Sequence, residues 1–219
     1  MQNDKKGARA YFDRVPAEWD ALYAHEDRSR YAVNRVLRKG LYDRYRFTFD
    51  RVGDLSGQSV LDIGCGTGRY AIECAQRGAA KVIGLDFAPS MIEFARRMAE
   101  QMGVADRCEF VCGDFLTHES EAGFDVVLAL GLFDYVADAA PLFEKIGRLR
   151  PRVFVASFPK FTPLWGTQRW VRYYWIKKCP VYNYHYEQIA GLCRRAGFAQ
   201  SLVVEGKRGL LCAAGEGLF

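Results

Sequence analysis

A glycine-rich turn between a predicted strand and a predicted helix limits the folds that this chain can adopt. Residues 59–63 are apolar and β-rich, and Gly64-Cys65-Gly66-Thr67-Gly68 follows them directly. Glycines let the backbone pass close to a ligand, because no Cβ stands in the way. A strand, a glycine turn and a helix in this order predict an open α/β sheet that binds its ligand at the turn.

Predicted strands and helices alternate through the centre of the chain. The strands are expected at residues 59–63, 81–86, 108–112, 124–130 and 153–157. One helix is expected at 67–77, one from Ser90, where Ser90 and Glu93 fit a capping box, and one at 138–149. Repeated β-α-β units with nearly continuous apolar strands predict a doubly wound, Rossmann-like parallel sheet with helices on both faces.

The two ends of the chain differ from this centre. Residues 1–52 are predicted to form an N-terminal helical cap, because apolar residues recur at three- and four-residue steps from Val33 to Phe49. Residues 53–219 are predicted to form the main domain. It carries an aromatic and basic insert at 159–186, then a helix at 187–196 and a β-hairpin of 201–205 with 210–214.

Composition excludes several classes of protein. The longest apolar run, 126–133, is far shorter than a membrane-spanning helix, and the polar start resembles no secretory signal. The seven cysteines form no C-x-x-C pair, and three histidines cannot build a zinc site, so no metal is expected. Mostly buried thiols in a reducing cytoplasm are the simplest interpretation.

Three acidic residues lie at the carboxyl ends of successive predicted parallel strands, and these ends meet at one edge of the sheet. Asp62 lies beside the glycine turn, where it can meet an ammonium group of a ligand. Asp86 ends the second strand and can accept hydrogen bonds from both hydroxyls of a ribose. Asp114 follows the third strand and can accept from an adenine amino group while Phe115 packs on the ring. The glycine spacing is G-x-G-x-G and not the G-x-G-x-x-G of dinucleotide folds.

These segments resemble the class I methyltransferases that use S-adenosylmethionine (SAM). The motifs that carry the resemblance are VLDIGCGTGRY, VIGLDFAPSMIEFAR, CGDF and FDVVLALGLFDYV, across about residues 59–158. The resemblance implies a seven-stranded sheet with an antiparallel last strand, and SAM as the cofactor with S-adenosylhomocysteine (SAH) as its product. The residues implied at the cofactor are Asp62, Gly64, Cys65, Gly66, Gly68, Asp86, Phe87, Met91, Asp114, Phe115 and Leu130.

The acceptor is expected after the fourth strand, at Asp134-Tyr135. Many members of the family that act on small molecules carry His-His or His-Tyr there, so this pair argues against a histidine base. Asp134 is a candidate general base or orienting group, and Tyr135 a candidate hydrogen-bond donor to the acceptor. The alternative is that Asp134 caps the next turn and Tyr135 belongs to the core.

The N-terminal segment is similar to the lead-in of magnesium-protoporphyrin and quinone O-methyltransferases, which folds over SAM as a lid. Tyr11, Tyr31 or Arg35 could then reach the methionine carboxylate or the acceptor; the alternative for each is a place in an ordinary packing helix. The insert could line an acceptor pocket or touch anionic lipid through 163–178, or it could be dimer surface or core. Its candidate substrate residues are Trp165, Trp170, Tyr174 and His185.

The predicted reaction is methyl transfer to an O or N atom of a small, aromatic or apolar/anionic acceptor. A lipid acceptor, an NAD(P)-linked oxidoreductase and a non-catalytic SAM-binding protein are the alternatives. No nucleic-acid partner is expected, because the fourth strand lacks the N/D-P-P-Y/F motif. The sequence does not indicate an oligomeric state.

Overall fold

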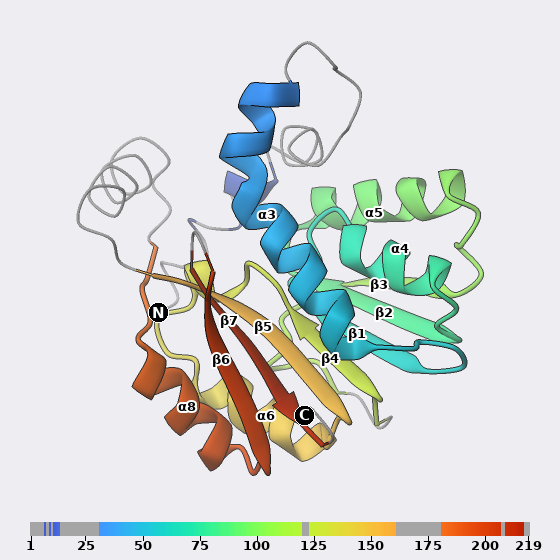
Figure 1. Cartoon of the computed structure of the whole chain (residues 1–219). Coiled ribbons are helices and arrows are strands. Elements are labelled where there is room, and N and C mark those ends of the chain that lie inside the picture. Colours follow the sequence, from blue (N-terminus) through green and yellow to red (C-terminus); the bar gives the residue numbers. More distant parts are fainter. Residues whose placement is uncertain are drawn as a thin grey trace.

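A computed structural model describes residues 7, 9, 11–13, 31–119, 123–160, 181–206 and 209–216; side chains 31–39 lie outside this set. Seven strands form one sheet in the order β3-β2-β1-β4-β5-β7-β6 (Figure 1). The first five strands pair in parallel, and β7 is antiparallel to both of its neighbours. The predicted Rossmann-like sheet with a single antiparallel last strand is therefore confirmed.

The bounds of the strands and helices agree closely with the prediction. The strands are β1 (Ser59–Ile63), β2 (Lys81–Asp86), β3 (Cys108–Cys112), β4 (Val126–Ala129), β5 (Val153–Pro159), β6 (Gln200–Gly206) and β7 (Gly209–Gly215). The helices are α3 (Tyr31–Val52), α4 (Arg69–Gln76), α5 (Pro89–Gln101), α6 (Ala140–Leu149) and α8 (Tyr186–Arg195), with a short 3-10 turn, η2 (Phe133–Tyr135).

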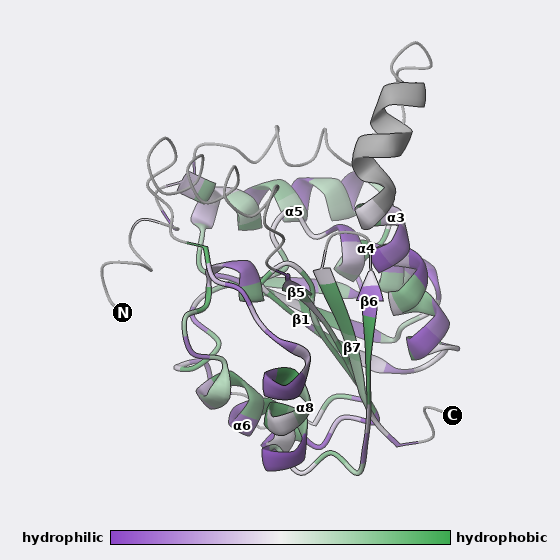
Figure 2. Ribbon diagram, turned by 60° about the vertical axis from the view of Figure 1, so that its left-hand side comes forward, coloured by the Kyte–Doolittle hydropathy of each residue, from purple (hydrophilic) through white to green (hydrophobic). Residues whose placement is uncertain are grey.

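Hydrophobic layers cover both faces of the sheet, and Figure 2 shows apolar residues concentrated on its strands. Successive residues of a strand point to opposite faces, so Val153 and Val155 join one core while Phe154 and Ala156 join the other. Helices α3, α4 and α5 contribute to the first core, and α6 and α8 to the second. The strands are apolar at consecutive positions because both of their faces are buried.

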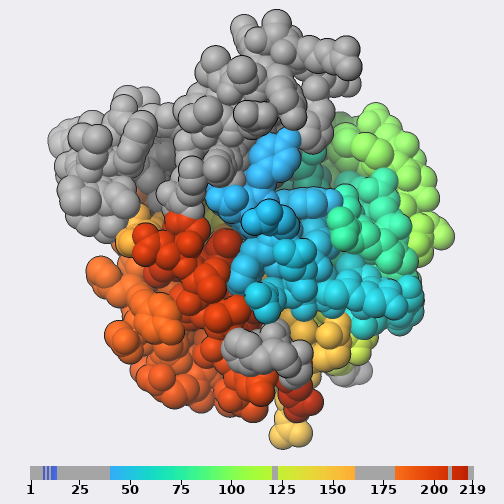
Figure 3. Space-filling view, in the orientation of Figure 1, coloured from blue at the N-terminus to red at the C-terminus, as the bar shows by residue number. Residues whose placement is uncertain are grey.

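Helix α3 packs on the same face as α4 and α5. Phe49 and Val52, near its end, are buried in that core, and Figure 3 shows its described part between the C-terminal strands and helices α4 and α5. The division into a cap at 1–52 and a domain at 53–219 stays a prediction. Among the residues that the structure describes, no helix is long and apolar enough to cross a membrane.

The predicted capping box at Ser90 is wrong. Helix α5 begins one residue earlier, with Pro89 in its first turn and Ala88 as the N-cap. Proline is favoured there because the first helical N–H has no partner in the helix, and its ring fixes φ near the helical value. Ser90 therefore lies inside the first turn, where its hydroxyl is available to another segment.

Candidate functional site

The candidate site lies at the carboxyl edge of the parallel strands. The strand order reverses between β1 and β4, which is where open α/β sheets bind ligands. The glycine turn after β1, the start of α5 after β2, the turn after β3 and the segment 130–135 after β4 all leave the sheet at this edge. The sequence therefore brings its predicted cofactor and acceptor residues to one place.

Asp86 connects three of these segments through hydrogen bonds. Its Oδ2 accepts from the Gly66 N–H at 2.9 Å, and its Oδ1 accepts from the Ala88 N–H at 2.9 Å. Its backbone carbonyl accepts from the Gly113 N–H at 2.9 Å. Burial raises the pKa of Asp86, while the Ala88 and Gly66 N–H groups lower it. A carboxylate oxygen has two lone pairs, so Asp86 can still accept from ribose hydroxyls.

Asp62 carries a buried oxygen without a partner. Its Oδ2 has no hydrogen-bond partner among the described residues, and the residue is only 2% exposed. Burial and, to a smaller extent, the charge of Asp86 raise the pKa of Asp62, the Ala71 N–H lowers it, and the net pKa is about 7. A buried polar atom without a donor is costly, so this carboxylate is suited to a cationic donor supplied by a ligand.

The three glycines of the turn differ in what surrounds them. All have positive φ, at 72°, 53° and 80° for Gly64, Gly66 and Gly68. A Cβ at Gly68 would lie 2.8 Å from the Cβ of Ala95, and one at Gly64 would lie 3.0 Å from Leu132. A Cβ at Gly66 would meet no described atom within 4 Å. Gly66 is thus the position where the turn has room for a ligand.

These features fit SAM. Its amino-acid end carries an ammonium group, which could donate a hydrogen bond to the unpartnered Asp62 oxygen. The Asp86 carboxylate could accept hydrogen bonds from the ribose hydroxyls. The open side of Gly66 would let the backbone approach the ligand. These roles stay predictions drawn from the chemistry of the donors and acceptors.

The remaining predicted cofactor residues surround this edge. Met91, Leu130 and Cys65 are buried in the core beneath it, and Phe87 is half-buried. Burial raises the pKa of the Cys65 thiol, and the neighbouring Asp86 and Asp62 charges raise it further. Phe115 is buried among the residues of the α6–α8 core. Contacts from these side chains to SAM stay predictions.

The acceptor candidates lie in and beside η2. Asp134 and Tyr135 are half-buried, and the Tyr135 N–H donates to the Leu132 carbonyl at 3.0 Å. The Asp134 carbonyl accepts from the Tyr182 N–H at 3.0 Å, which attaches the end of the insert to this turn. Tyr184 donates its hydroxyl hydrogen to the Val136 carbonyl at 2.5 Å. The turn is therefore held from the α8 side of the molecule.

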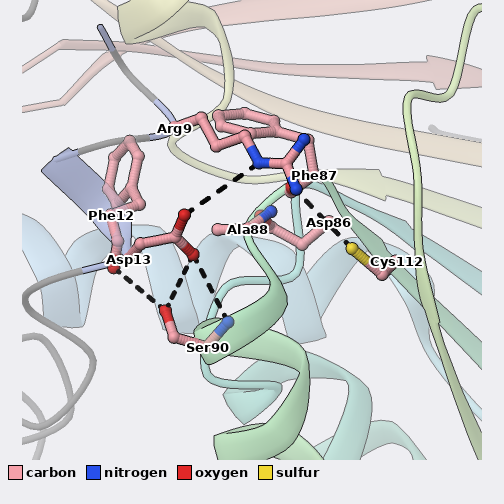
Figure 4. Close-up of polar contacts among 8 residues, drawn as sticks. All are labelled: Arg9, Phe12, Asp13, Asp86, Phe87, Ala88, Ser90 and Cys112. Atoms are coloured by element: carbon pink, nitrogen blue, oxygen red, sulfur yellow. Dashed lines mark hydrogen bonds and ion pairs between the residues drawn. The ribbon is translucent and has the colours of Figure 1, made fainter. Parts of the chain in front are cut away.

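The N-terminal segment reaches this edge, through residues that the sequence reasoning missed. The ring of Phe12 lies edge-on to both Tyr135 and Phe87. Asp13 Oδ1 accepts from the Ser90 hydroxyl at 3.1 Å and from its N–H at 3.4 Å (Figure 4). The hydroxyl of Ser90 also lies 3.5 Å from the Phe12 carbonyl. No local pattern could have identified these contacts, because they join residues more than 70 positions apart.

Arg44 on α3 also reaches the site and was not predicted. Its guanidinium Nη1 lies 3.0 Å from where a Cβ at Gly131 would stand, and Gly131 has a φ of 81°. The Gly131 N–H donates to the buried Ser157 hydroxyl at 2.8 Å. A cation is thus present beside the end of β4, whereas the sequence predicted Arg35 as the cationic residue from this helix.

The predicted substrate residues of the N-terminal segment and the insert are mostly outside the part of the chain that the structure describes. The side chains of Tyr31, Arg35, Trp165, Trp170 and Tyr174, and residues 163–178 as a whole, lie outside the described set. Tyr11 is half-buried, with its ring centroid 5.1 Å from that of Phe12. His185 is exposed and is the N-cap residue of α8, and its side chain makes no capping hydrogen bond there.

Comparison with known proteins identifies a methyltransferase domain in the centre of the chain. Residues 54–157 match the family model described as a methyltransferase domain. Ribosomal protein L11 methyltransferase of Escherichia coli strain 55989 is 43% identical over 91 residues. That match covers 42% of this chain and 30% of the relative, so the chain spans less than a third of that protein's length.

Solved structures share the fold over nearly the whole chain. Magnesium protoporphyrin IX methyltransferase from Synechocystis PCC 6803 with bound SAM has a TM-score of 0.73 at 22% identity, covering 97% of each chain. The same protein with bound SAH gives 0.72. The cyclase SpnF gives 0.67 at 17% identity, covering 95% of this chain and 94% of its own. The predicted class I fold is confirmed, and the ligands in the first two structures support the predicted cofactor.

Proposed function

We propose that this protein transfers the methyl group of SAM to an O or N atom of a small aromatic or apolar/anionic metabolite. Residues 54–157 match the family model of a methyltransferase domain, and the chain shares its fold with a methyltransferase solved with bound SAM and SAH. The observation that carries the cofactor side is the buried Asp62 oxygen without a partner beside the open face of Gly66. When bound, SAM supplies a methyl group attached to a positively charged sulfur. The sulfur keeps the electron pair of the C–S bond that breaks, and so becomes the neutral thioether of SAH.

Aromatic side chains near the end of β4 support the choice of acceptor. The ring of Phe12 contacts the rings of both Phe87 and Tyr135. Aromatic rings favour flat, apolar partners through stacking and edge-on contacts. The Synechocystis neighbour is, by its name, a methyltransferase of magnesium protoporphyrin IX, itself a flat ring system, and this chain matches it over nearly its full length.

Asp134 is the candidate base on the acceptor side. The acceptor oxygen or nitrogen forms the new bond to the methyl carbon, and the proton it loses passes to the Asp134 carboxylate. Tyr135 would donate a hydrogen bond to the acceptor, and Arg44 would favour an acceptor that carries negative charge. The chain's part in the reaction is otherwise alignment, which contributes about 7–11 kcal/mol in well-oriented reactions.

Calorimetry and product analysis test the proposal together. We expect SAM and SAH to bind the full chain while NAD does not, and SAH to accumulate when a pool of flat aromatic hydroxy and carboxylic acids is supplied. Binding of NAD in place of SAM would overturn the cofactor assignment. Turnover only with phospholipid vesicles would replace the small acceptor with a lipid. SAM binding without turnover on any acceptor would identify a non-catalytic binder.

A further inference from the structure

Lys145, in the middle of α6, donates hydrogen bonds to three backbone carbonyls of the turn after β3. Its Nζ lies 2.6 Å from the Phe115 oxygen, 3.2 Å from the Leu116 oxygen and 2.5 Å from the His118 oxygen. The same ammonium lies 4.9 Å from the centroid of the Phe115 ring. A lysine has three N–H donors, so this arrangement uses its full capacity.

The turn that Lys145 holds begins at Asp114, the predicted partner of adenine. The Asp114 carbonyl accepts from the N–H groups of Thr117 at 3.1 Å and His118 at 2.9 Å. Its side-chain Oδ1 accepts from the Leu116 N–H at 3.0 Å. Residues 114–118 therefore form a single helical turn, too short to be stable alone. The carbonyls at the end of such a turn need donors from elsewhere.

We propose that Lys145 is a positioning residue for the cofactor's adenine, since it closes the 114–118 turn and thereby fixes the Asp114 carboxylate. This inference rests on the proposed function. Lys145 does not itself touch the ligand: its ammonium acts on the backbone side of the turn. A cation at the carbonyl end of a helical turn is also favoured by the turn's dipole.

Hydrogen exchange in the ligand-free protein tests the first half of this proposal. We expect Lys145→Met to speed exchange of the Leu116, Thr117 and His118 amides by at least about tenfold, because the turn opens locally. Lys145→Arg keeps a charged donor and should recover much of the protection. The matched control is Lys81→Met, at the start of β2, whose exposed side chain pairs only with Glu109 at 3.7 Å among the described residues. Unchanged exchange in folded Lys145→Met would overturn the proposal.

Ligand discrimination tests the second half. S-inosylhomocysteine carries an oxygen in place of the adenine amino group, so the ratio of its Kd to that of SAH measures recognition of this group. We expect Lys145→Met to reduce this ratio by at least about fivefold, while Lys81→Met leaves it unchanged. A residue that only stabilised the fold would lower the Tm and leave the ratio intact, and that result would reject the positioning role.

The two possible failures can be told apart. If wild-type protein binds neither SAH nor its inosine analogue, the proposed function fails and this inference falls with it. If wild-type protein prefers SAH and Lys145→Met keeps the same preference, only the role of Lys145 is rejected. Should Lys145→Met not fold, Lys145→Gln, which removes the charge and shortens the side chain, carries the same two measurements. Shifts in the same direction are expected, and unchanged values would reject the role.

Discussion

The ring of Phe12 stands edge-on to the ring of Tyr135, with centroids 4.9 Å apart and planes at 88°. On its other side Phe12 meets Phe87, at 6.3 Å and 77°. One side chain from the N-terminal segment thus bridges the residue that follows β2 and the turn that follows β4. The first of these segments is predicted to hold the ribose and the second the acceptor, so Phe12 lies across both halves of the site.

Phe12→Ala should shorten the residence of the cofactor. An aromatic pair contributes about 0.5–1.5 kcal/mol beyond its buried area, so we expect SAH to dissociate about two- to tenfold faster. Stopped-flow displacement of SAH measures this rate. Phe198→Ala is the control, since it removes a stacked ring 5.7 Å from Phe154 within the other core. It should lower stability without changing the rate; equal rates in wild type and Phe12→Ala would contradict the bridging role.

The affinity for SAH should rise as pH rises towards 7. The pKa of Asp62 is raised to about 7, so the ligand-free site is mostly protonated below that pH and cannot pair with an ammonium group. Calorimetry from pH 5 to 7.5 should show a Kd that falls by up to about tenfold per unit. Asp62→Asn should remove this dependence. Methylthioadenosine, which lacks the amino-acid end, should bind wild type without it, and a strong pH dependence for that ligand would reject the assignment.

The same carboxyl group should make the ligand-free protein less stable at higher pH. Its folded pKa lies above its unfolded value of about 3.9, so the folded state binds the proton more tightly. That contribution is complete below about pH 4 and is lost as pH rises to about 7. Asp62→Asn should therefore gain on the order of 1–4 kcal/mol relative to wild type between pH 4.5 and 7.5. Urea unfolding of both proteins at pH 4.5 and 7.5 measures this gain. If the difference in their free energies of unfolding were the same at both pH values, Asp62 would not be a buried group that ionises in this range.

The strands could be predicted because their signal is local. β1, β2 and β3 have the bounds expected from the sequence, since short apolar runs ended by glycine or aspartate have few other interpretations. The start of helix α5 was harder to predict. Ser90 and Glu93 satisfy the capping-box pattern, but Pro89 suits the first helical position better, and the Ser90 hydroxyl bonds to Asp13 instead.

The site was predictable only where its residues lie at the carboxyl ends of strands. Asp62, Asp86 and Asp114 could be found because parallel strands bring their carboxyl ends to one edge. Phe12 and Arg44 could not, because each comes from a helical segment whose side of approach depends on tertiary packing. Lys145 also carried no signal, since its three acceptors are backbone carbonyls of residues 27 to 30 positions away.

Two glycines of the same turn should respond differently to alanine. In Gly68→Ala the new Cβ would lie 2.8 Å from Ala95 and 2.9 Å from Phe110, at a φ of 80°. Strain and overpacking should together lower stability by about 2–5 kcal/mol. In Gly66→Ala the methyl group enters open space, so the loss of stability should be about 1–2 kcal/mol and the main effect a weaker binding of SAH. Thermal unfolding with and without SAH separates the loss of stability from the loss of SAH binding. Equal losses of stability in the two variants would contradict the open face at Gly66.

Asp134→Asn tests the base, the step on which the acceptor chemistry depends. If the carboxylate takes the acceptor's proton, kcat should fall by about 10²–10⁴-fold while the Kd for SAH stays within about twofold of wild type. Tyr135→Phe removes one hydrogen-bond donor and should raise the KM for the acceptor more than it lowers kcat. The Asp134 carbonyl still accepts from the Tyr182 N–H in both variants, so the turn should keep its shape. A wild-type kcat in Asp134→Asn would show that Asp134 only shapes the turn. The acceptor's proton would then pass to solvent or to another group.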